Sequence, residues 1–258
     1  MDAFTKRQGA RILALVCFAL QICGAYSTTV AADEIRVAVA SNFSNAARAL
    51  AQHFTHQSGH KVMLVFGASG KHYAQTRNGA PFDAFFSADV KRPERLEKEG
   101  LIVPDSRFTY AVGKLVLWSP DPHQVDATGA ILENGDFRHL AMANPKLAPY
   151  GRAAQEVLKR LGHGQRLQNR IVRGENIGQT FQYVKSGNAE LGFVAYSQIK
   201  YPDRPITGSW WAIPDSLYDA IDQQAVLLKE NSSARAFLEF VRSRQGREII
   251  RSFGYETP

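Results

Sequence analysis

Two short loops carry residue types that can hold an anion. Ser41 and Asn42 follow the run 34–40, and Ser69 follows the run 61–66. Both runs are rich in β-branched and small residues, as strands are, and a helical pattern follows each loop. In open parallel sheets, ligands bind at the carboxyl ends of the strands, where the N–H groups of the next helix favour an anion. The repeated pattern indicates an anion site, although turn and N-cap chemistry would explain either loop alone.

A serine nucleophile is the alternative chemistry for the same loops. Ser41 or Ser69 would need a histidine base, and His72 is the only histidine near either loop. The stretch 67–71 departs from the G-x-S-x-G pattern because it ends in Lys71. It also departs from the phosphate-loop pattern, because position 65 is Val and His72 stands where Ser or Thr is needed. A secreted hydrolase therefore remains an alternative without a motif to support it.

Metal and nucleic-acid binding are both disfavoured by the pattern of charges and histidines. His53, His56 and His60 lie at i, i+3 and i+7, but Gly59 is expected to end their helix and no carboxylate lies among them. We expect a solvated helix end there rather than a metal site. The basic residues of 91–99 are mixed with glutamates, which is typical of a solvated helix face. The five arginines of 235–251 come with two glutamates and no exposed aromatic ladder, so this stretch does not indicate a nucleic-acid interface.

The first 32 residues have the layout of a secretory signal peptide. Three basic residues precede the apolar run 12–26, and small residues follow up to Ala31 and Ala32, either of which is a suitable cleavage position. The run is shorter than a membrane-spanning helix needs, so an uncleaved anchor is the weaker interpretation. A lipid anchor on Cys23 is also weaker, because the residues before it, Leu20 to Ile22, lack the small residue that such processing expects.

Removal of residues 1–32 changes what the composition means. The whole chain has 258 residues, 31 Lys and Arg, 24 Asp and Glu, and a formal net charge of +7. Cleavage removes three basic residues and one acidic residue, together with Cys17 and Cys23, leaving 226 residues with a charge of +5 and no cysteine. An exported chain of this kind excludes thiol redox chemistry, a disulfide scaffold and thiolate metal sites. The positive charge permits an anionic ligand without identifying it.

Strand-like and helix-like segments alternate along the rest of the chain. We expect strands at 34–40, 61–66, 82–87, 111–118, 140–143, 171–172, 191–196 and 225–228, and helices at 44–56, 71–77, 92–99, 152–161, 177–186 and 233–253. This rhythm predicts β-α-β units, parallel sheets and two similar lobes. No Pro-, Gly- and Ser-rich linker divides the chain, so strands must join the lobes.

Over residues 34–255 the sequence resembles the periplasmic molybdate-binding proteins that serve ABC transporters. Ten stretches carry the resemblance through their order and spacing: 37–43, 66–70, 82–89, 143–145, 148–154, 174–177, 191–197, 211–214, 224–228 and 246–255. It implies an α/β fold of the two-lobed periplasmic binding protein kind (type 2), each lobe a mainly parallel sheet flanked by helices, with the ligand between them. The implied first lobe is 33–111 plus 224–258, and the second is 112–223, with chain crossings near 110–114 and 222–225.

The resemblance also implies a set of residues that bind the ligand. The set is Ser41, Asn42, Ser69, Tyr150, Ile177 and Tyr196. The serine and Tyr196 hydroxyls, the backbone N–H of Ile177, and either the side chain or the backbone of Tyr150 would hold oxyanion oxygens. None of the six is Asp or Glu, and this suits a fully deprotonated dianion, whereas protonated phosphate would need an acceptor for its proton. Molybdenum would enter only as the bound oxyanion, with no direct protein–metal ligands and no cofactor.

The implied function is that of a monomeric periplasmic receptor that captures molybdate, and tungstate as well, and delivers it to a membrane ABC permease. No enzymatic activity and no nucleic-acid partner are expected. Sulfate, phosphate or ferric ion on the same fold is the nearest alternative, since Tyr150 and Tyr196 resemble part of an iron site. A secreted serine hydrolase is the more distant one.

Overall fold

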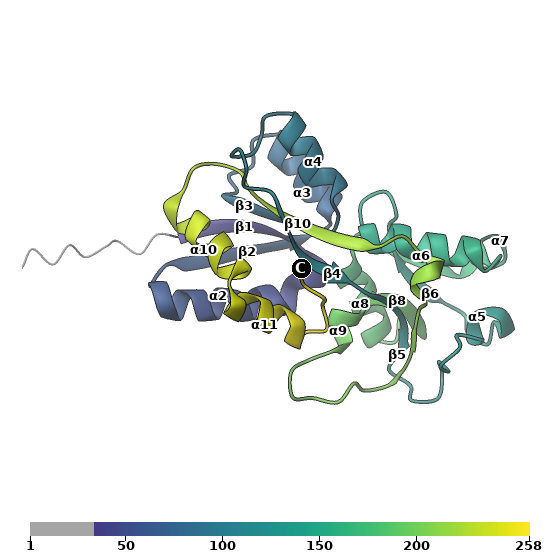
Figure 1. Ribbon diagram of the computed structural model, residues 1–258. Helices are drawn as coiled ribbons and strands as arrows, with labels where there is room; N and C mark the ends of the chain where they lie inside the picture. Colours follow the sequence, from purple (N-terminus) through teal and green to yellow (C-terminus); the bar gives the residue numbers. More distant parts are fainter. Residues whose placement is uncertain (1–33) are drawn as a thin grey trace, which may run out of the picture. The chain divides into compact units, whose positions relative to one another are not determined.

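The structure, a computed structural model, describes residues 34–258. The predicted signal peptide, with Cys17, Cys23 and both cleavage positions, lies outside the described residues. In the described part, two five-stranded sheets are each flanked by helices (Figure 1). We call each sheet with its helices a lobe.

The first lobe contains a mixed sheet in the order β2-β1-β3-β10-β4. Its strands are β1 (Glu34–Ala40), β2 (Lys61–Gly67), β3 (Ala84–Ser87), β4 (Phe108–Gly113) and β10 (Ile221–Leu227). Its helices are η1 (Ser41–Phe43), α2 (Ser44–Ser58), α3 (Ser69–Arg77), α4 (Lys91–Lys98), α10 (Ser232–Arg242) and α11 (Arg244–Ser252). β1 is parallel to β2 and β3, whereas β10 is antiparallel to both β3 and β4.

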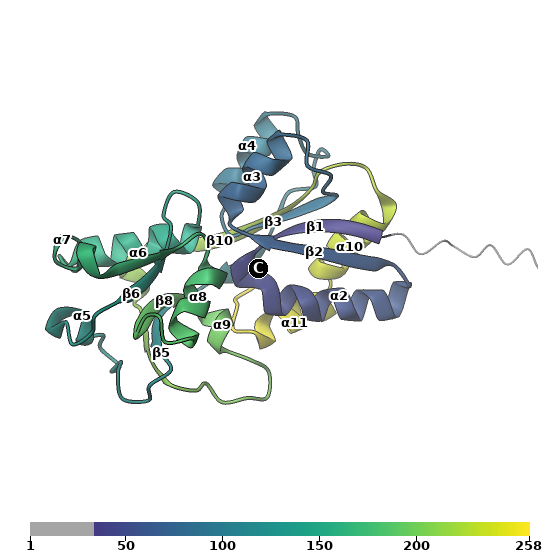
Figure 2. The same cartoon turned by 180° about the vertical axis from the view of Figure 1, so that it is seen from behind.

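Alternation along β1 explains why helices cover both faces of this sheet. Val37 and Val39 are buried in the core under α2, α10 and α11, and Ala38 between them is buried with Phe85 and Leu96 on the other face. A strand buried on both faces reads as a continuous apolar run, and this strand does. In both ribbon views, α3 and α4 lie on one side of the sheet, and α2, α10 and α11 lie on the other (Figures 1 and 2).

The second lobe has its own sheet, in the order β7-β6-β8-β5-β9. Its strands are β5 (Leu115–Ser119), β6 (Leu140–Ala143), β7 (Ile171–Gly174), β8 (Leu191–Ala195) and β9 (Ser209–Ala212). Its helices are α5 (Ile131–Asn134), α6 (Pro149–Arg160), α7 (Gly164–Leu167), η2 (Gln168–Arg170), α8 (Ile177–Lys185), α9 (Tyr196–Ile199) and η3 (Asp215–Leu217). Leu117 and Phe193 face the core under α6, and Val116 and Val194 face the core that contains Val184 of α8.

The chain passes between the lobes along neighbouring strands. β4 ends at Gly113 in the first sheet, and β5 begins at Leu115 in the second. β4 pairs with β10, and Gly113 lies opposite Ile221. In the first sheet, β4 therefore extends two residues beyond the predicted boundary at 111, and β10 begins three residues before the predicted boundary at 224. The ladder shifts between Gln223, which pairs with Ala111, and Gln224, which pairs with Thr109. This β-bulge leaves Tyr110 as the extra residue.

The structure confirms the two-lobed α/β fold, and several elements differ from those predicted, three of them as follows. The expected strand at 111–118 is two strands in different sheets, broken at Lys114. The expected helix at 233–253 is two helices, because Ser243 is extended and its hydroxyl caps α11 by accepting the N–H of Gly246. β9 was not predicted, since only two of its four residues, Trp210 and Trp211, are typical of strands.

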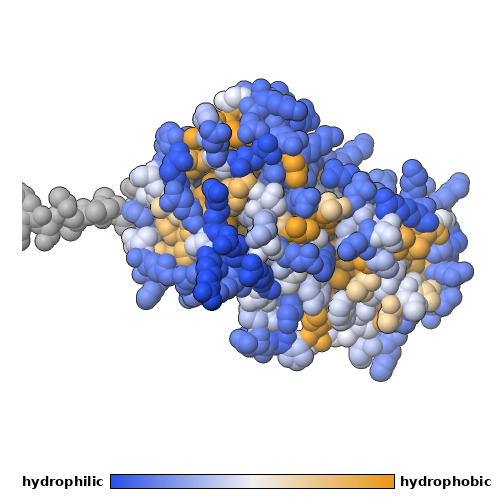
Figure 3. Space-filling view, in the orientation of Figure 1, coloured by the Kyte–Doolittle hydropathy of each residue, from blue (hydrophilic) through white to orange (hydrophobic). Residues whose placement is uncertain are grey.

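The surface of the described residues is predominantly polar. On the face shown in Figure 3, apolar residues lie between polar ones rather than in one large patch. Met63 and Leu101 are the exposed large hydrophobic residues in this part of the chain. None of the helices within residues 34–258 combines the length and apolarity needed to cross a membrane.

Candidate anion-binding site

The six predicted ligand residues share one local feature, because each lies in the first turn of a helix. Ser41 opens η1, Ser69 opens α3, Tyr150 is the second residue of α6 and Ile177 opens α8. The first N–H groups of a helix have no partner within it, and the helix dipole is positive at this end. Helix starts that meet at one place therefore supply N–H donors to an anion.

Ser41 brings two of these helix starts together across the lobes. Its Oγ accepts a hydrogen bond of 3.0 Å from the backbone N–H of Gly178 in α8. A hydroxyl that accepts one hydrogen bond still has its own proton to donate. Gly178 also allows the close approach, because a Cβ there would lie 3.1 Å from the Cβ of Ser41.

Ser69 also accepts a backbone N–H, but from a residue of its own lobe. Its Oγ accepts the backbone N–H of Ala88 at 3.0 Å, and the residue is almost fully buried. The next residue, Gly70, donates its N–H to the carbonyl of Leu147 at 2.9 Å, which joins the start of α3 to the loop before α6. The Ser69 hydroxyl proton is thus also available for a ligand.

The side chain of Asn42 is engaged inside the protein. Its Nδ2 donates to Oε1 of Gln223 at 2.7 Å and to the hydroxyl of Tyr255 at 3.0 Å. Its Oδ1 is buried and has no hydrogen-bond partner among the described residues. Because both protons of the amide are used, the donor that remains for an anion is the backbone N–H of Asn42.

Tyr150 is buried with its hydroxyl hydrogen-bonded to the crossing strand. The hydroxyl accepts from Nε2 of Gln223 at 3.3 Å, and the residue is 1% exposed. Burial raises the pKa of the Tyr150 hydroxyl well above its ordinary value of 10.0, with smaller contributions from nearby tyrosines. The group therefore keeps its proton and is a hydrogen-bond donor at neutral pH.

Ile177 lies where a main-chain donor is needed. The residue is buried, and its carbonyl accepts from Nε2 of Gln198 at 3.0 Å, which fixes the peptide in place. Asn176 caps the helix by accepting the N–H of Gln179 at 3.0 Å. The N–H of Ile177 is therefore the first of α8 and points toward the end of the helix where Ser41 lies.

Tyr196 opens α9, and the contacts of its ring are with residues outside the predicted set. Its ring packs on Trp210, with 5.4 Å between ring centroids, and lies so close to Gly254 that a Cβ there would be 2.6 Å from it. The next residue is the one that faces the site, because Ser197 Oγ donates to the carbonyl of Asn42 at 3.0 Å. The position of Ser197 right after a buried strand is the signal that sequence reasoning passed over.

His72 lies beneath the two loops and is fully engaged. Its Nε2 is 3.2 Å from the carbonyl of Val39 and its Nδ1 is 3.1 Å from Oε1 of Gln75. Burial lowers the pKa of the imidazole from its ordinary value of 6.5, partly opposed by these hydrogen bonds. Neither ring nitrogen is bonded to a serine. In the part of the chain that the structure describes, no three His, Cys, Asp or Glu residues are grouped so as to hold a metal ion.

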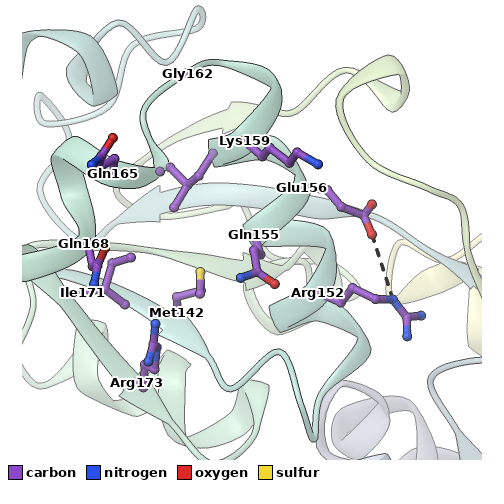
Figure 4. A pocket seen from close by; sticks show the side chains of 12 residues that line it. Met142, Arg152, Gln155, Glu156, Lys159, Gly162, Gln165, Gln168, Ile171 and Arg173 are labelled. Carbon is purple, nitrogen blue, oxygen red and sulfur yellow. Dashed lines mark ion pairs between the residues drawn. The ribbon is translucent and has the colours of Figure 1, made fainter.

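A separate groove of about 670 Å³ lies on the second lobe (Figure 4). It is lined by α6, α7, β6 and β7, and none of the six predicted ligand residues belongs to its lining. Its polar groups come from exposed side chains such as Arg152, Lys159 and Arg173, and Arg152 lies 4.0 Å from Glu156. The groove contains none of the helix starts at which the predicted residues lie.

Comparison with known proteins identifies the family. The profile described as bacterial extracellular solute-binding protein matches residues 35–256. The chain belongs to this family. Among solute-binding proteins it is similar to the molybdate-binding protein ModA of Azotobacter vinelandii, with 48% identity over 90% of this chain and 93% of the relative. It is also similar to ModA of Rhodobacter capsulatus, with 46% identity over 98% of this chain and 97% of that one.

A solved solute-binding structure agrees with the sequence comparison. The Azotobacter vinelandii periplasmic molybdate-binding protein superposes with a TM-score of 0.85 at 44% identity, and the match covers 87% of this chain and 99% of that one. The sequence match and the structural match both extend across the two lobes. The helix starts described above therefore belong to the part of the chain that matches these proteins.

Proposed function

We propose that this protein is a periplasmic receptor that captures molybdate and delivers it to an ABC permease. The observation that carries the proposal is the meeting of helix starts around hydroxyl groups that keep a proton to donate. Ser41 and Ser69 each accept a backbone N–H and so retain a free O–H donor. The two relatives described above are named as molybdate-binding proteins, and this agrees with the proposed ligand.

The proposed ligand set is Ser41, Asn42, Ser69, Tyr150 and Ile177. The two serines and Tyr150 would donate through their hydroxyls, and Asn42 and Ile177 through their backbone N–H groups. A tetrahedral dianion accepts hydrogen bonds and donates none, so a set made only of donors suits it. Preorganised donors stabilise the charge without a buried cation, and they favour an ion whose oxygens match their positions. We leave Tyr196 out, because its ring packs on Trp210.

Tungstate is proposed as a second ligand, because it is a tetrahedral dianion of nearly the same size. Protonated phosphate is less suitable, since the proposed ligand set has no carboxylate to accept its proton. The ferric-ion alternative required Tyr150 and Tyr196 to act together, and the packing of the Tyr196 ring against Gly254 weighs against this. The hydrolase alternative required His72 as a base, and both of its ring nitrogens face other groups.

We further propose that the protein is exported, acts as a monomer without cofactor, and catalyses no reaction. Its lobes would be 33–111 plus 224–258 and 112–223, and they would close on the ligand by bending the crossing strands. The hydrogen bond between Ser41 and Gly178 and the ion pair between Lys71 and Glu175, 3.0 Å apart, are contacts that such closure would make.

Side-by-side titration of molybdate, tungstate, sulfate and phosphate tests the proposal. Trp118, Trp210 and Trp211 all lie on β5 and β9 of the second lobe, so intrinsic fluorescence is a suitable signal of closure. We expect saturable responses to molybdate and tungstate, confirmed by calorimetry, and much weaker binding of sulfate and phosphate. If none of the four oxyanions binds in the calorimeter, the receptor function is wrong.

A further inference from the structure

Gln223 is a fully buried polar residue that contacts both halves of the proposed site. It lies on the crossing strand β10 and is 0% exposed. Its Oε1 accepts from Nδ2 of Asn42 at 2.7 Å and from the hydroxyl of Tyr110 at 3.0 Å. Its Nε2 donates to the hydroxyl of Tyr150 at 3.3 Å. One amide thus joins a ligand residue of the first lobe to a ligand residue of the second.

The β-bulge places this amide at the site. Because the register shifts between Gln223 and Gln224, Gln223 and the extra residue Tyr110 meet on the inner side of the crossing strands. Gln224 is engaged elsewhere, with Arg107 at 2.9 Å and Thr109 at 3.2 Å. The two neighbouring glutamines therefore have the same chemistry and different surroundings.

Gly113 provides the space in which the amide meets Tyr150. A Cβ at this position would lie 2.0 Å from the Tyr150 hydroxyl and 2.5 Å from Nε2 of Gln223. Any larger residue would displace one of the two groups. The crossing strands thus contribute both groups: β10 carries the Gln223 amide, and Gly113 of β4 leaves the space in which it meets Tyr150.

We propose that Gln223 is a positioning residue for oxyanion binding, which turns the Tyr150 hydroxyl into a donor toward the ligand and holds the Asn42 peptide in place. This inference rests on the proposed function. The direction of each hydrogen bond matters here. Because the Tyr150 oxygen accepts from the amide, its own proton is free for the oxyanion. Because Oε1 accepts from Asn42, the Asn42 side chain is held away from the ligand and the first loop is fixed.

The link also connects ligand binding to the hinge. Asn42 belongs to the first lobe, Tyr150 to the second, and Gln223 to a strand along which the chain passes between them. A group bonded to both lobes on a crossing strand keeps its full set of partners only while the lobes hold their closed arrangement. Binding and closure would therefore be coupled through this amide.

Gln223→Glu tests the proposal with a side chain of the same shape. An ionised carboxylate only accepts, so Tyr150 would donate its proton to Glu and lose it as a donor to the ligand. We expect molybdate affinity at pH 8.5 to fall about 100-fold, the scale for lost hydrogen bonds to a charged ligand. A buried carboxyl has a raised pKa, so acidification to pH 6 should protonate it and restore tenfold or more of the affinity. Binding by the wild type should change little over this range.

Gln224→Glu is the matched control. It places the same charge on the adjacent residue, where it faces Arg107 instead of the site. We expect its molybdate affinity to stay within about threefold of the wild type, the scale for a charge change outside the site. A loss as large as that of Gln223→Glu would show that charge alone, and not the contacts of Gln223, is responsible.

A double-mutant cycle separates positioning from general damage to the fold. Gln223→Met introduces no charge and should weaken molybdate binding by about tenfold in the wild-type background. In the Tyr150→Phe background the same substitution should have a much smaller effect, because the hydroxyl that Gln223 positions is already absent. Thermal unfolding of each variant measures damage to the fold independently. Wild-type affinity in Gln223→Glu at both pH values, or equal losses from Gln223→Met in both backgrounds, would overturn the proposal. Failure of the wild type to bind molybdate would instead overturn the receptor function itself.

Discussion

The hydroxyl of Ser41 lies 3.0 Å from the backbone nitrogen of Gly178, and the two residues belong to different lobes. A serine from the end of β1 therefore stands at the start of α8, with its oxygen occupied and its proton free. Further bonds cross the lobes beside it, from Ser197 to Asn42 and from Gly70 to Leu147. The described arrangement is a closed one, in which the proposed donors are already in place.

Ser69→Ala should weaken molybdate binding by about 1.5–3 kcal/mol, the loss of one hydrogen bond to a charged group. Isothermal titration calorimetry measures the change. Ser58→Ala is the matched control, because Ser58 is exposed at the far end of α2 and its hydroxyl bonds only to the backbone of Phe54 and His60. Unchanged affinity in the Ser69 variant would mean that this hydroxyl is not a ligand.

Two tyrosine-to-phenylalanine variants should behave differently. Tyr150→Phe removes the buried hydroxyl proposed as a ligand and should reduce affinity about tenfold or more. Tyr196→Phe keeps the ring on Trp210 and should change affinity less than about twofold, the scale of an exposed polar change. Fluorescence titration of both variants with molybdate compares them directly. The reverse ranking would restore Tyr196 as a ligand and remove Tyr150.

Gly113→Ala should displace the Tyr150 hydroxyl, since the new methyl group would lie 2.0 Å from it. We expect at least tenfold weaker molybdate binding, about 1.4 kcal/mol, together with lower stability. Gly164→Ala is the control, because the nearest atom to its Cβ is 3.9 Å away. Calorimetry measures the change in molybdate affinity, and thermal unfolding measures the change in stability. Wild-type affinity in Gly113→Ala would contradict the close packing of Gly113 against Tyr150.

Lys71→Gln should have a small effect that depends on salt. The ion pair of Lys71 with Glu175 joins the lobes, but both side chains are about half exposed. Such pairs contribute less than about 1 kcal/mol, and salt screens them. We expect affinity to fall about twofold to fivefold at low ionic strength, and the difference from wild type to vanish in high salt. Lys61 is the first residue of β2, at the end of the strand away from Ser69. Lys61→Gln should therefore show no salt-dependent change in affinity.

Stability should fall as the pH drops below about 6.5, and His72 should cause part of the fall. Burial lowers the pKa of His72 in the folded protein from 6.5, so the unfolded chain binds the proton more tightly. The unfolding free energy therefore decreases as the pH falls through the unfolded pKa. Denaturant unfolding of His72→Gln from pH 7.5 to 5 should show a shallower slope than the wild type. The exposed His53→Gln control should keep the wild-type slope, and equal slopes in all three would contradict the role of His72.

Much of the first lobe could be predicted because its signals are local. Gly59 ends α2 in the left-handed conformation, φ 77°, as its place after the helical pattern indicated. The strand runs before Ser41 and Ser69 fixed where the loops begin, and the structure places both serines at helix starts. Three of the predicted ligand residues, Ser41, Asn42 and Ser69, thus follow from strand–loop–helix patterns that a reader can see in the printed sequence.

The network behind the site could not be predicted from such patterns. Gln223, Tyr255 and Asn42 are separated by long stretches of chain and meet through tertiary hydrogen bonds. Gln223 faces the site because of a bulge, and no residue type marks a bulge of this kind in the sequence. Tyr196 shows the same limit. β8 ends at Ala195, one residue before the predicted strand end, and Tyr196 opens α9 with its ring packed on Trp210.

The place of β10 in the first sheet also determines the order in which the lobes can be completed. β10 lies between β3 and β4, so a chain that has emerged only as far as β9 holds all five strands of the second sheet. At that point β4 has no neighbour in its own sheet, although it was made long before. The sheet of the first lobe can therefore be completed only after β10, which begins at residue 221 of 258, has been made.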